Sequence, residues 1–240
     1  MLALLTVGCG QSLPGIPRTP TIPPAVEAPS ETVLTPPAQP TPAAPAVNPA
    51  GVYGVTGTNV FGLPYEGTMR IAPRGPVFQV DWQTGNPYRG IGVVVGTSLG
   101  VAFGGDVCGV STYTLDPAGN LAGRWLTVGI ERIGTEQALR TAAGADLAGA
   151  YQVSGRNPDG SAYQGELNVI RRGEVYQFSW KIPSELEGVG VQQGNAVTVG
   201  WGGQTCGVAQ YVVESTGNLR GAFGAFGQNY LGRETAIRQQ

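Results

Sequence analysis

The chain has 240 residues, of which 39 are glycine and 19 are proline, and only 12% are charged, for a formal net charge of -2. This composition is typical of an extracytoplasmic all-β protein. The 14 Lys and Arg residues are scattered. No run of them can neutralise several phosphates together, which excludes a nucleic-acid-binding protein of the usual kind.

The chain contains no histidine. This absence removes Ser-His-Asp and Cys-His catalytic arrangements, and with them the commonest transition-metal ligand. We therefore expect a protein that is not an enzyme, with no catalytic residues, no cofactor and no metal site.

Residues 1–9 form an apolar run that ends in Gly8 and Cys9. The run resembles the end of a bacterial lipoprotein signal peptide, and the resemblance implies that Cys9 is lipidated and becomes the first residue of the mature protein. Because the run is short and lacks a basic segment, we expect the true start codon upstream. The alternative is an ordinary apolar N-terminus with an incidental cysteine.

Residues 10–50 are rich in proline, threonine and alanine. Such a segment cannot bury enough apolar area to offset its chain entropy, so it is predicted to be a disordered linker with polyproline II character. A proline-rich docking site for another protein is the alternative. A lipid at Cys9 followed by this linker predicts an extracytoplasmic protein of the bacterial cell envelope, attached to the outer membrane.

Residues 51–140 and 149–238 are two copies of one module, aligned without insertion or deletion at a constant separation, which is 206 − 108 = 98 for the two cysteines. This self-similarity indicates a tandem duplication. Identical pairs include Trp82 with Trp180, Cys108 with Cys206, Tyr113 with Tyr211 and Glu136 with Glu234.

Apolar residues alternate with polar ones along each module, as in half-buried strands, and turn signals separate the runs. Eight strands are predicted in the first module, near 51–57, 65–72, 76–83, 89–95, 98–103, 107–115, 120–127 and 132–139. Inward-facing pairs are predicted at Met69 and Ile71, and at Ile91 and Val93. Eight short antiparallel strands predict one small up-and-down barrel per module, with a two-sheet sandwich as the alternative. Glycines within the strands, such as Gly90 and Gly123, favour the barrel.

The second module carries the pattern Gly149-Ala-Tyr151-Gln-Val153-Ser-Gly155-Arg-Asn157-Pro-Asp-Gly160, followed by Tyr163-Gln-Gly165, Trp180 and Gly217-Asn-Leu219-Arg-Gly221. This pattern resembles a set of bacterial envelope proteins, some of which carry the label fibronectin-binding. The resemblance covers about residues 50–238 and implies a protein partner in the envelope or outside the cell.

Cys108 and Cys206 occupy equivalent positions, and neither has a Lys or His beside it to activate the thiol. The favoured interpretation is a buried thiol in the core of each module. A disulfide between the modules is the alternative, because a pseudo-twofold axis can bring equivalent residues together.

Glu136 and Glu234 are the acidic residues kept identical in both modules. We expect structural carboxylates that accept backbone N–H groups or pair with an arginine, such as Arg140 or Arg238. A general acid needs a second placed group, and no other acidic residue is repeated beside them.

Aromatic residues repeated in both modules are the candidates for lining a small-molecule cavity. They are Tyr53, Tyr65, Trp82, Tyr113, Tyr151, Tyr163, Trp180 and Tyr211. Filling of a small barrel core is the alternative. From the sequence we expect a non-catalytic, lipid-anchored envelope protein that acts as a structural or adhesive binding unit; the alternative is a small-molecule carrier that uses the barrel interiors.

Overall fold

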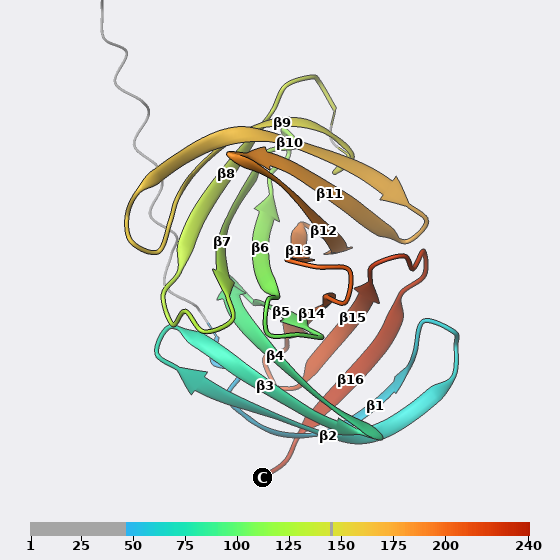
Figure 1. Cartoon of the computed structure of the whole chain (residues 1–240). Coiled ribbons are helices and arrows are strands. Elements are labelled where there is room, and N and C mark those ends of the chain that lie inside the picture. The colour runs from blue at the N-terminus through green and yellow to red at the C-terminus, as the bar shows by residue number, and fades with distance from the viewer. Residues whose placement is uncertain (1–46, 145) are drawn as a thin grey trace, which may run out of the picture. The chain divides into compact units, whose positions relative to one another are not determined.

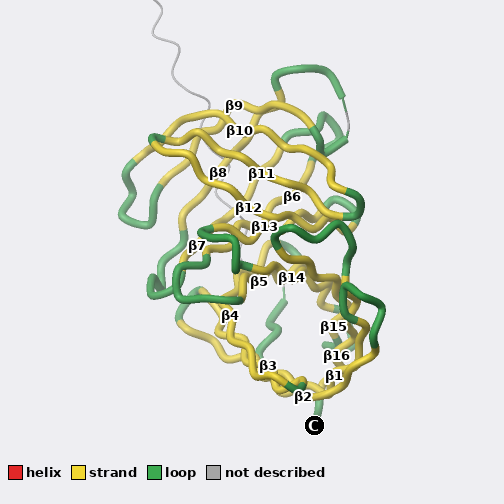
Figure 2. The backbone as a smooth tube through the Cα atoms, turned by 45° about the vertical axis from the view of Figure 1, so that its right-hand side comes forward, coloured by secondary structure: helices red, strands yellow, loops and turns green. Residues whose placement is uncertain are grey.

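The computed structural model describes residues 47–144 and 146–240, all of which belong to one compact unit. These residues form antiparallel β-strands that close into two eight-stranded barrels, with no helix in the described part (Figures 1 and 2). The predicted pair of small antiparallel barrels is confirmed, and the sandwich alternative is wrong. Cys9 and most of the predicted linker lie outside the described residues.

The first barrel, called barrel A, joins five strands of the first module to three strands of the second. Around barrel A the strands are β1 (Gly51–Thr58), β16 (Gly232–Arg238), β15 (Leu219–Ala225), β14 (Gly207–Val213), β5 (Ser98–Phe103), β4 (Asn86–Val95), β3 (Val77–Thr84) and β2 (Pro64–Arg74). In Figure 1 the blue-green strands β1–β5 and the red strands β14–β16 therefore share one barrel.

The second barrel, called barrel B, is one continuous stretch of the chain. Around barrel B the strands are β9 (Gly149–Arg156), β8 (Gly134–Arg140), β7 (Leu121–Thr127), β6 (Gly109–Leu115), β13 (Ala196–Trp201), β12 (Ser184–Gln193), β11 (Val175–Ile182) and β10 (Ala162–Arg172). Every strand of barrel B has a counterpart at the equivalent position of barrel A, and the counterpart comes from the other module. The two barrels therefore have equivalent strand orders.

The two modules have exchanged their last three strands. The prediction that each module forms a barrel from its own eight strands is therefore wrong, because each barrel combines five strands of one module with three of the other. Strand β5 pairs with β14 instead of β6, and β13 pairs with β6 instead of β14. Since β6 and β14 carry the same apolar pattern, either pairing satisfies the alternation of the sequence. The chain passes between the barrels twice, in segments 104–108 and 202–206.

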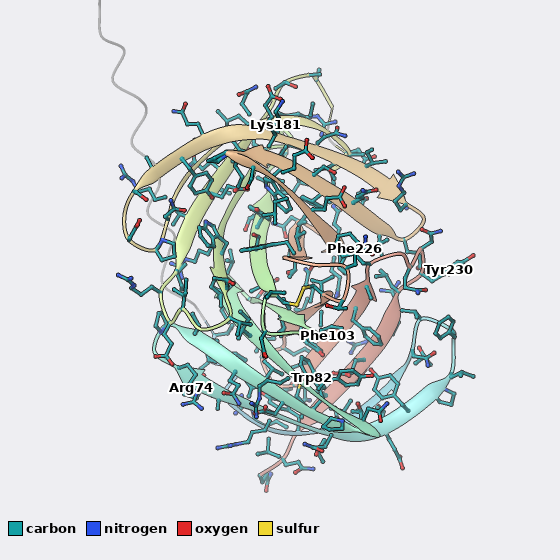
Figure 3. All side chains as sticks on the ribbon, viewed as in Figure 1. Arg74, Trp82, Phe103, Lys181, Phe226 and Tyr230 are labelled. Atoms are coloured by element: carbon teal, nitrogen blue, oxygen red, sulfur yellow. A yellow bond between two sulfur atoms is a disulfide. The ribbon has the colours of Figure 1, made fainter. Side chains whose placement is uncertain are left out.

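A disulfide joins these two crossing segments. Cys108 and Cys206 are bridged, with Cα atoms 5.6 Å apart, and both residues are fully buried (yellow bond, Figure 3). The favoured interpretation of two separate core thiols is therefore wrong, and the alternative is correct. The strand exchange explains the outcome, because it brings the equivalent segments of the two modules side by side.

The outer face of β4 is apolar because it packs between the barrels. Ile91 and Val93 join a cluster that includes Val110 and Leu126 of barrel B, whereas Val94 points into barrel A. The prediction that Ile91 and Val93 face inward is wrong. Both faces of this strand are buried, so the alternation of its apolar residues does not identify the interior.

One end of barrel A is closed by Arg238 and by the segment before β1. The Arg238 guanidinium donates hydrogen bonds to the Ala50 carbonyl (2.7 Å) and to the Tyr53 hydroxyl (2.9 Å), and it lies 5.3 Å from the centre of the Tyr53 ring. The Tyr53 hydroxyl in turn donates to the Pro49 carbonyl (2.7 Å). The last residues of the predicted linker, 47–50, are thus part of the folded barrel.

Barrel B is closed in the same way. Arg140 donates to the Ala148 carbonyl (2.7 Å) and to the Tyr151 hydroxyl (3.0 Å), and Tyr151 donates to the Leu147 carbonyl (2.7 Å). In both barrels this plug leaves the opposite end as the entrance to the interior.

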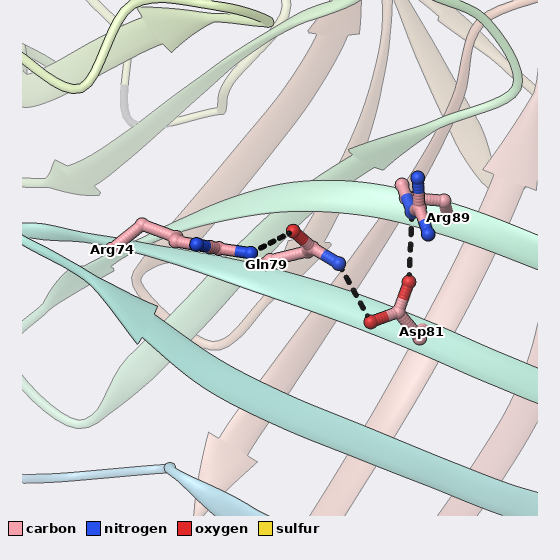
Figure 4. A network of polar contacts seen from close by, with 4 residues as sticks. All are labelled: Arg74, Gln79, Asp81 and Arg89. Atoms are coloured by element: carbon pink, nitrogen blue, oxygen red, sulfur yellow. Dashed lines mark hydrogen bonds and ion pairs between the residues drawn. The ribbon is translucent and has the colours of Figure 1, made fainter.

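The outward face of β3 carries a polar network (Figure 4). Gln79 accepts a hydrogen bond from Arg74 (3.2 Å) and donates one to Asp81 (2.8 Å), which also pairs with Arg89 (2.9 Å). Because both arginines are exposed to solvent, the network contributes little to stability. Within the described residues, no helix is long and apolar enough to cross a membrane.

Candidate functional site

Each barrel has a cavity at the end opposite its arginine plug. Pocket A, in barrel A, has a volume of about 250 Å³ and is lined by Asn59, Tyr65, Trp82, Thr84, Tyr88, Phe103, Ala209, Tyr211, Phe223 and Glu234. Pocket B, in barrel B, has a volume of about 170 Å³ and is lined by Ser111, Trp125, Glu136, Asn157, Tyr163, Trp180, Ile182, Pro183, Leu186 and Trp201. Aromatic rings dominate both linings, and each holds one carboxylate.

Glu234 forms the floor of pocket A and is only 5% exposed. Its carboxylate accepts hydrogen bonds from the hydroxyls of Tyr211 (2.6 Å) and Tyr65 (2.7 Å) and from the indole N–H of Trp82 (3.3 Å). Tyr65 and Trp82 come from the first module, whereas Tyr211 and Glu234 come from the second. The strand exchange therefore makes this site a composite of both modules.

Glu136, 4% exposed, forms the same floor in pocket B. It accepts hydrogen bonds from Tyr113 (2.7 Å), Tyr163 (2.9 Å) and the Trp180 indole (3.1 Å). The prediction that the two glutamates pair with backbone N–H groups or with arginine is wrong. Arg140 and Arg238 lie at the closed ends, four residues further along β8 and β16, a separation of about 13 Å in a strand.

Burial shifts the pKa values of the ionisable groups at the floor of pocket B. It raises the pKa of Glu136, although the hydrogen bonds from Tyr113, Tyr163 and Trp180 act in the opposite direction. Burial and the nearby charge of Glu136 also raise the pKa of Tyr113 and of Tyr163. The phenols therefore stay protonated and act as hydrogen-bond donors to the floor.

Glycines on neighbouring strands hold the aromatic rings in place. A Cβ atom at any of these glycines would lie closer than 3.0 Å to the ring opposite it, so the ring lies flat on the bare backbone. The directly paired positions in barrel A are Gly57 with Tyr65, Gly207 with Phe103, Gly221 with Tyr211 and Gly232 with Phe223; in barrel B they are Gly155 with Tyr163, Gly109 with Trp201, Gly123 with Tyr113 and Gly134 with Trp125.

Edge-to-face contacts between the rings complete the walls. In barrel A the centre of the Phe103 ring lies 5.8 Å from that of Trp82 and 6.1 Å from that of Tyr88. In barrel B, Trp125 lies 5.9 Å from Trp201. Such contacts add about 0.5–1.5 kcal/mol each beyond the burial of apolar area, so the walls are pre-formed without a ligand.

The turns beside the two pockets differ in polarity. In the β1–β2 turn of barrel A, the Asn59 side chain accepts the backbone N–H groups of Phe61 and Leu63, and these two apolar side chains are 74% and 60% exposed. The corresponding turn of barrel B carries Asp159 and Ser161, which hydrogen-bond to each other (2.6 Å).

The structure separates the eight aromatic residues predicted from the sequence into two groups. Five of them line the pockets, and Tyr113 binds the floor carboxylate of pocket B; the five are Tyr65, Trp82 and Tyr211 in barrel A, and Tyr163 and Trp180 in barrel B. Tyr53 and Tyr151 lie at the closed ends, where they bind the arginine plugs.

The lining residues predicted from the sequence did not include the rings that vary between the copies. Phe103 corresponds to Trp201, and Phe223 corresponds to Trp125, so a search for identical pairs passes over them. The available signal was the glycine that pairs with each ring across the strands, at Gly207 and at the other positions given above. The role of the glutamates as pocket floors was also missed.

A larger depression of about 520 Å³ lies on the outside of β3 and β4, near segment 126–131. Its charged residues, among them Arg74, Asp106 and Glu131, are all exposed to solvent. It lacks the buried polar floor of pockets A and B, so it is a weaker candidate for a specific site.

Among the described residues, no group of three His, Cys, Asp or Glu side chains is placed to hold a metal ion. No protein-family model matches the sequence, and no curated protein is significantly similar to it. The resemblance to envelope proteins labelled fibronectin-binding therefore stays an expectation from the sequence motifs.

Proposed function

We propose that this chain is a non-catalytic binding protein that holds one small ligand in the open pocket of each barrel. Of the two functions expected from the sequence, this is the small-molecule carrier. The observation that carries the proposal is the repeated site: in both barrels one buried carboxylate, held by two tyrosines and a tryptophan, lies beneath a ring of aromatic side chains. Pockets with apolar walls and a few placed polar groups are the usual form of small-molecule sites.

The chemistry of the floor favours binding over catalysis. Each pocket lining contains one carboxylate, Glu234 or Glu136, whose hydrogen-bond donors are phenols and an indole. Glycosidase-type catalysis needs a second carboxyl group about 5–10 Å away, and neither lining supplies one.

The proposed setting is the bacterial cell envelope, with Cys9 as the lipid anchor to the outer membrane and residues 10–50 as the spacer. The Cys108–Cys206 disulfide supports an oxidising, extracytoplasmic compartment, because such bonds persist there and are rare in the cytosol. A chain anchored in this way presents its pockets to the periplasm or to the outside of the cell.

Adhesion to an envelope or extracellular protein is a second candidate function. It is favoured by exposed apolar side chains on loops of barrel A, namely Phe61, Leu63 and Tyr230, of which Tyr230 points away from the barrels in Figure 3. Exposed apolar groups of this kind are typical of contact surfaces when they are contiguous.

The test of the carrier function is a screen of small neutral fragments by ligand-observed NMR on the full chain. Two variants fill the pockets: Thr84→Trp in pocket A and Ile182→Trp in pocket B, which are equivalent positions. Each should remove about half of the bound fragment, whereas Val52→Trp, on an exposed part of β1, should remove none. Fragments that bind equally well to the double pocket-filling variant would contradict the proposal.

A further inference from the structure

The charge of the pocket floor is not compensated by the groups that hold it. Glu234 is buried and accepts hydrogen bonds from Tyr65, Tyr211 and Trp82, and all three donors are neutral. Neutral donors stabilise an ionised carboxylate, but they leave its net negative charge inside an aromatic pocket. Burial of such a charge is unfavourable unless an opposite charge approaches it.

The walls of the pockets also favour a positively charged ligand. Trp82, Tyr88, Phe103 and Phe223 surround pocket A, and Trp125, Trp180 and Trp201 surround pocket B. The faces of aromatic rings carry negative electrostatic potential and attract cations placed within about 6 Å of the ring centre.

The hydrogen-bonding needs of the ligand differ among cations. Besides the floor, the side chains that can accept a hydrogen bond are those of Ser111, Asn157 and Tyr163 in pocket B, and they include Asn59, Thr84 and Tyr88 in pocket A. A primary ammonium has three N–H donors and a guanidinium has five, and each of these donors needs an acceptor in the pocket. An ammonium group whose hydrogens are replaced by methyl groups has no such requirement and needs only the carboxylate and the aromatic walls.

The volumes set the size of the group. Pocket A, at about 250 Å³, and pocket B, at about 170 Å³, both fall below the roughly 300–1,000 Å³ of sites that enclose drug-sized ligands. Each therefore has room for a compact head group, and the rest of a longer ligand would extend out of the barrel.

We propose that pockets A and B recognise a quaternary or methylated ammonium group, which sits between the aromatic rings and above Glu234 or Glu136. This inference rests on the proposed function, and it names the class of ligand that the same two sites accept. Zwitterions or lipid head groups that end in trimethylammonium belong to this class.

The test compares two probes of almost equal shape by isothermal titration calorimetry on the full chain at pH 8. Choline carries the charge, and 3,3-dimethylbutan-1-ol has carbon in place of the nitrogen. We expect two choline sites per chain and an affinity about 30-fold higher than for the alcohol, the ratio expected for a desolvated cation–π site.

Two variants assign the effect to pocket A. Glu234→Gln keeps the shape of the floor and should lower choline affinity at one of the two sites about tenfold or more, with little change for the alcohol. Tyr88→Leu introduces the residue that the equivalent position of pocket B carries and should weaken choline binding at the same site. Tyr230→Ala, on an exposed loop, is the control and should change neither site.

Equal affinity for choline and the alcohol would overturn the charged ligand class, while leaving the carrier function intact. Failure of choline to bind would also overturn the inference, and the screen with neutral fragments then decides separately whether the carrier function survives. If Glu234→Gln loses the near-ultraviolet circular dichroism of the folded chain, Phe223→Leu gives the decision, because this position carries an aromatic ring in both pockets. Unchanged choline affinity in that variant contradicts the proposal.

Discussion

Pockets A and B share one floor and differ in their walls. The carboxylate, two tyrosines and tryptophan are identical in both, whereas Phe103 and Phe223 of pocket A are replaced by Trp201 and Trp125 in pocket B. With the larger indole rings, and with Ile182 in place of Thr84, pocket B has a volume of about 170 Å³ instead of about 250 Å³. The wall residues can thus change the volume of a site while its carboxylate stays unchanged.

The floor can stay constant because the backbone holds it. Each floor tyrosine lies on a glycine of the adjacent strand, as Tyr211 lies on Gly221, so the ring has a fixed place in either barrel. At the wall positions the ring also lies on a glycine of the adjacent strand, whether the ring is a phenylalanine or a tryptophan. The difference between the pockets therefore requires no change in strand register.

The largest effect that separates the two pockets is expected from excision of barrel B. Residues 104–206 contain all of β6–β13 and both bridged cysteines, so this fragment should fold as a monomer and retain one ligand site. Size-exclusion chromatography with circular dichroism measures both properties of the fragment; a fragment 104–206 that stays unfolded or forms only dimers would contradict the assignment of a complete barrel to this stretch.

Loss of the disulfide should lower the free energy of unfolding and should lower the ligand affinity of both pockets equally. The bridge joins residues 98 positions apart, and the loop-entropy model gives up to about 4.7 kcal/mol for a loop of this length, with 2–4 kcal/mol typical. The double change Cys108→Ser and Cys206→Ser should lower the free energy of unfolding by about that amount in a urea titration. If only one pocket lost ligand affinity, the bridge would not be the shared support that the fold indicates.

A single glycine should damage one pocket and spare the other. Gly232→Ala places a methyl group against the Phe223 ring in barrel A, and Gly134→Ala does the same against Trp125 in barrel B. Each should destabilise the chain by about 1–3 kcal/mol through overpacking and weaken ligand binding in its own barrel only. The matched control is Gly54→Ala, where the added methyl group meets only Gln239 at 3.5 Å. The free energy of unfolding of this variant should equal that of the unmodified chain.

The smallest expected effect is a pH dependence from Glu136. Burial raises its pKa in the folded state, so the folded chain binds the proton more tightly than the unfolded chain does. This contribution to stability is complete below the ordinary glutamate pKa of 4.5 and is lost as the pH rises through the raised value. Urea titrations between pH 4 and 8 should show a shallower decline for Glu136→Gln, whereas the exposed-residue control Glu166→Gln should follow the unmodified chain.

The strands could be predicted from the sequence because period-two alternation depends on local burial. Predicted strands such as 98–103 and 120–127 agree with β5 (Ser98–Phe103) and β7 (Leu121–Thr127) to within a residue. The glycines within strands also correctly favoured closed barrels. These features depend on neighbours in the chain, which the sequence displays directly.

The pairing of strands between modules could not be predicted in this way. Since β6 and β14 are near copies, no local pattern tells β5 which of them to pair with, and the composite pockets depend on that choice. The disulfide was left as an alternative for the same reason. Glu234 was recognised as a repeated residue, but its partners Tyr65 and Trp82 lie in the other module, beyond the reach of a pattern within one copy.

The most direct test of a binding role for the two pockets is a crystal structure of the full chain with choline. The account predicts one trimethylammonium group above Glu234 and one above Glu136, each with its nitrogen within about 6 Å of the surrounding ring centres. Choline bound only on the outer surfaces, with both pockets free of it at a concentration that saturates binding in solution, would contradict the account.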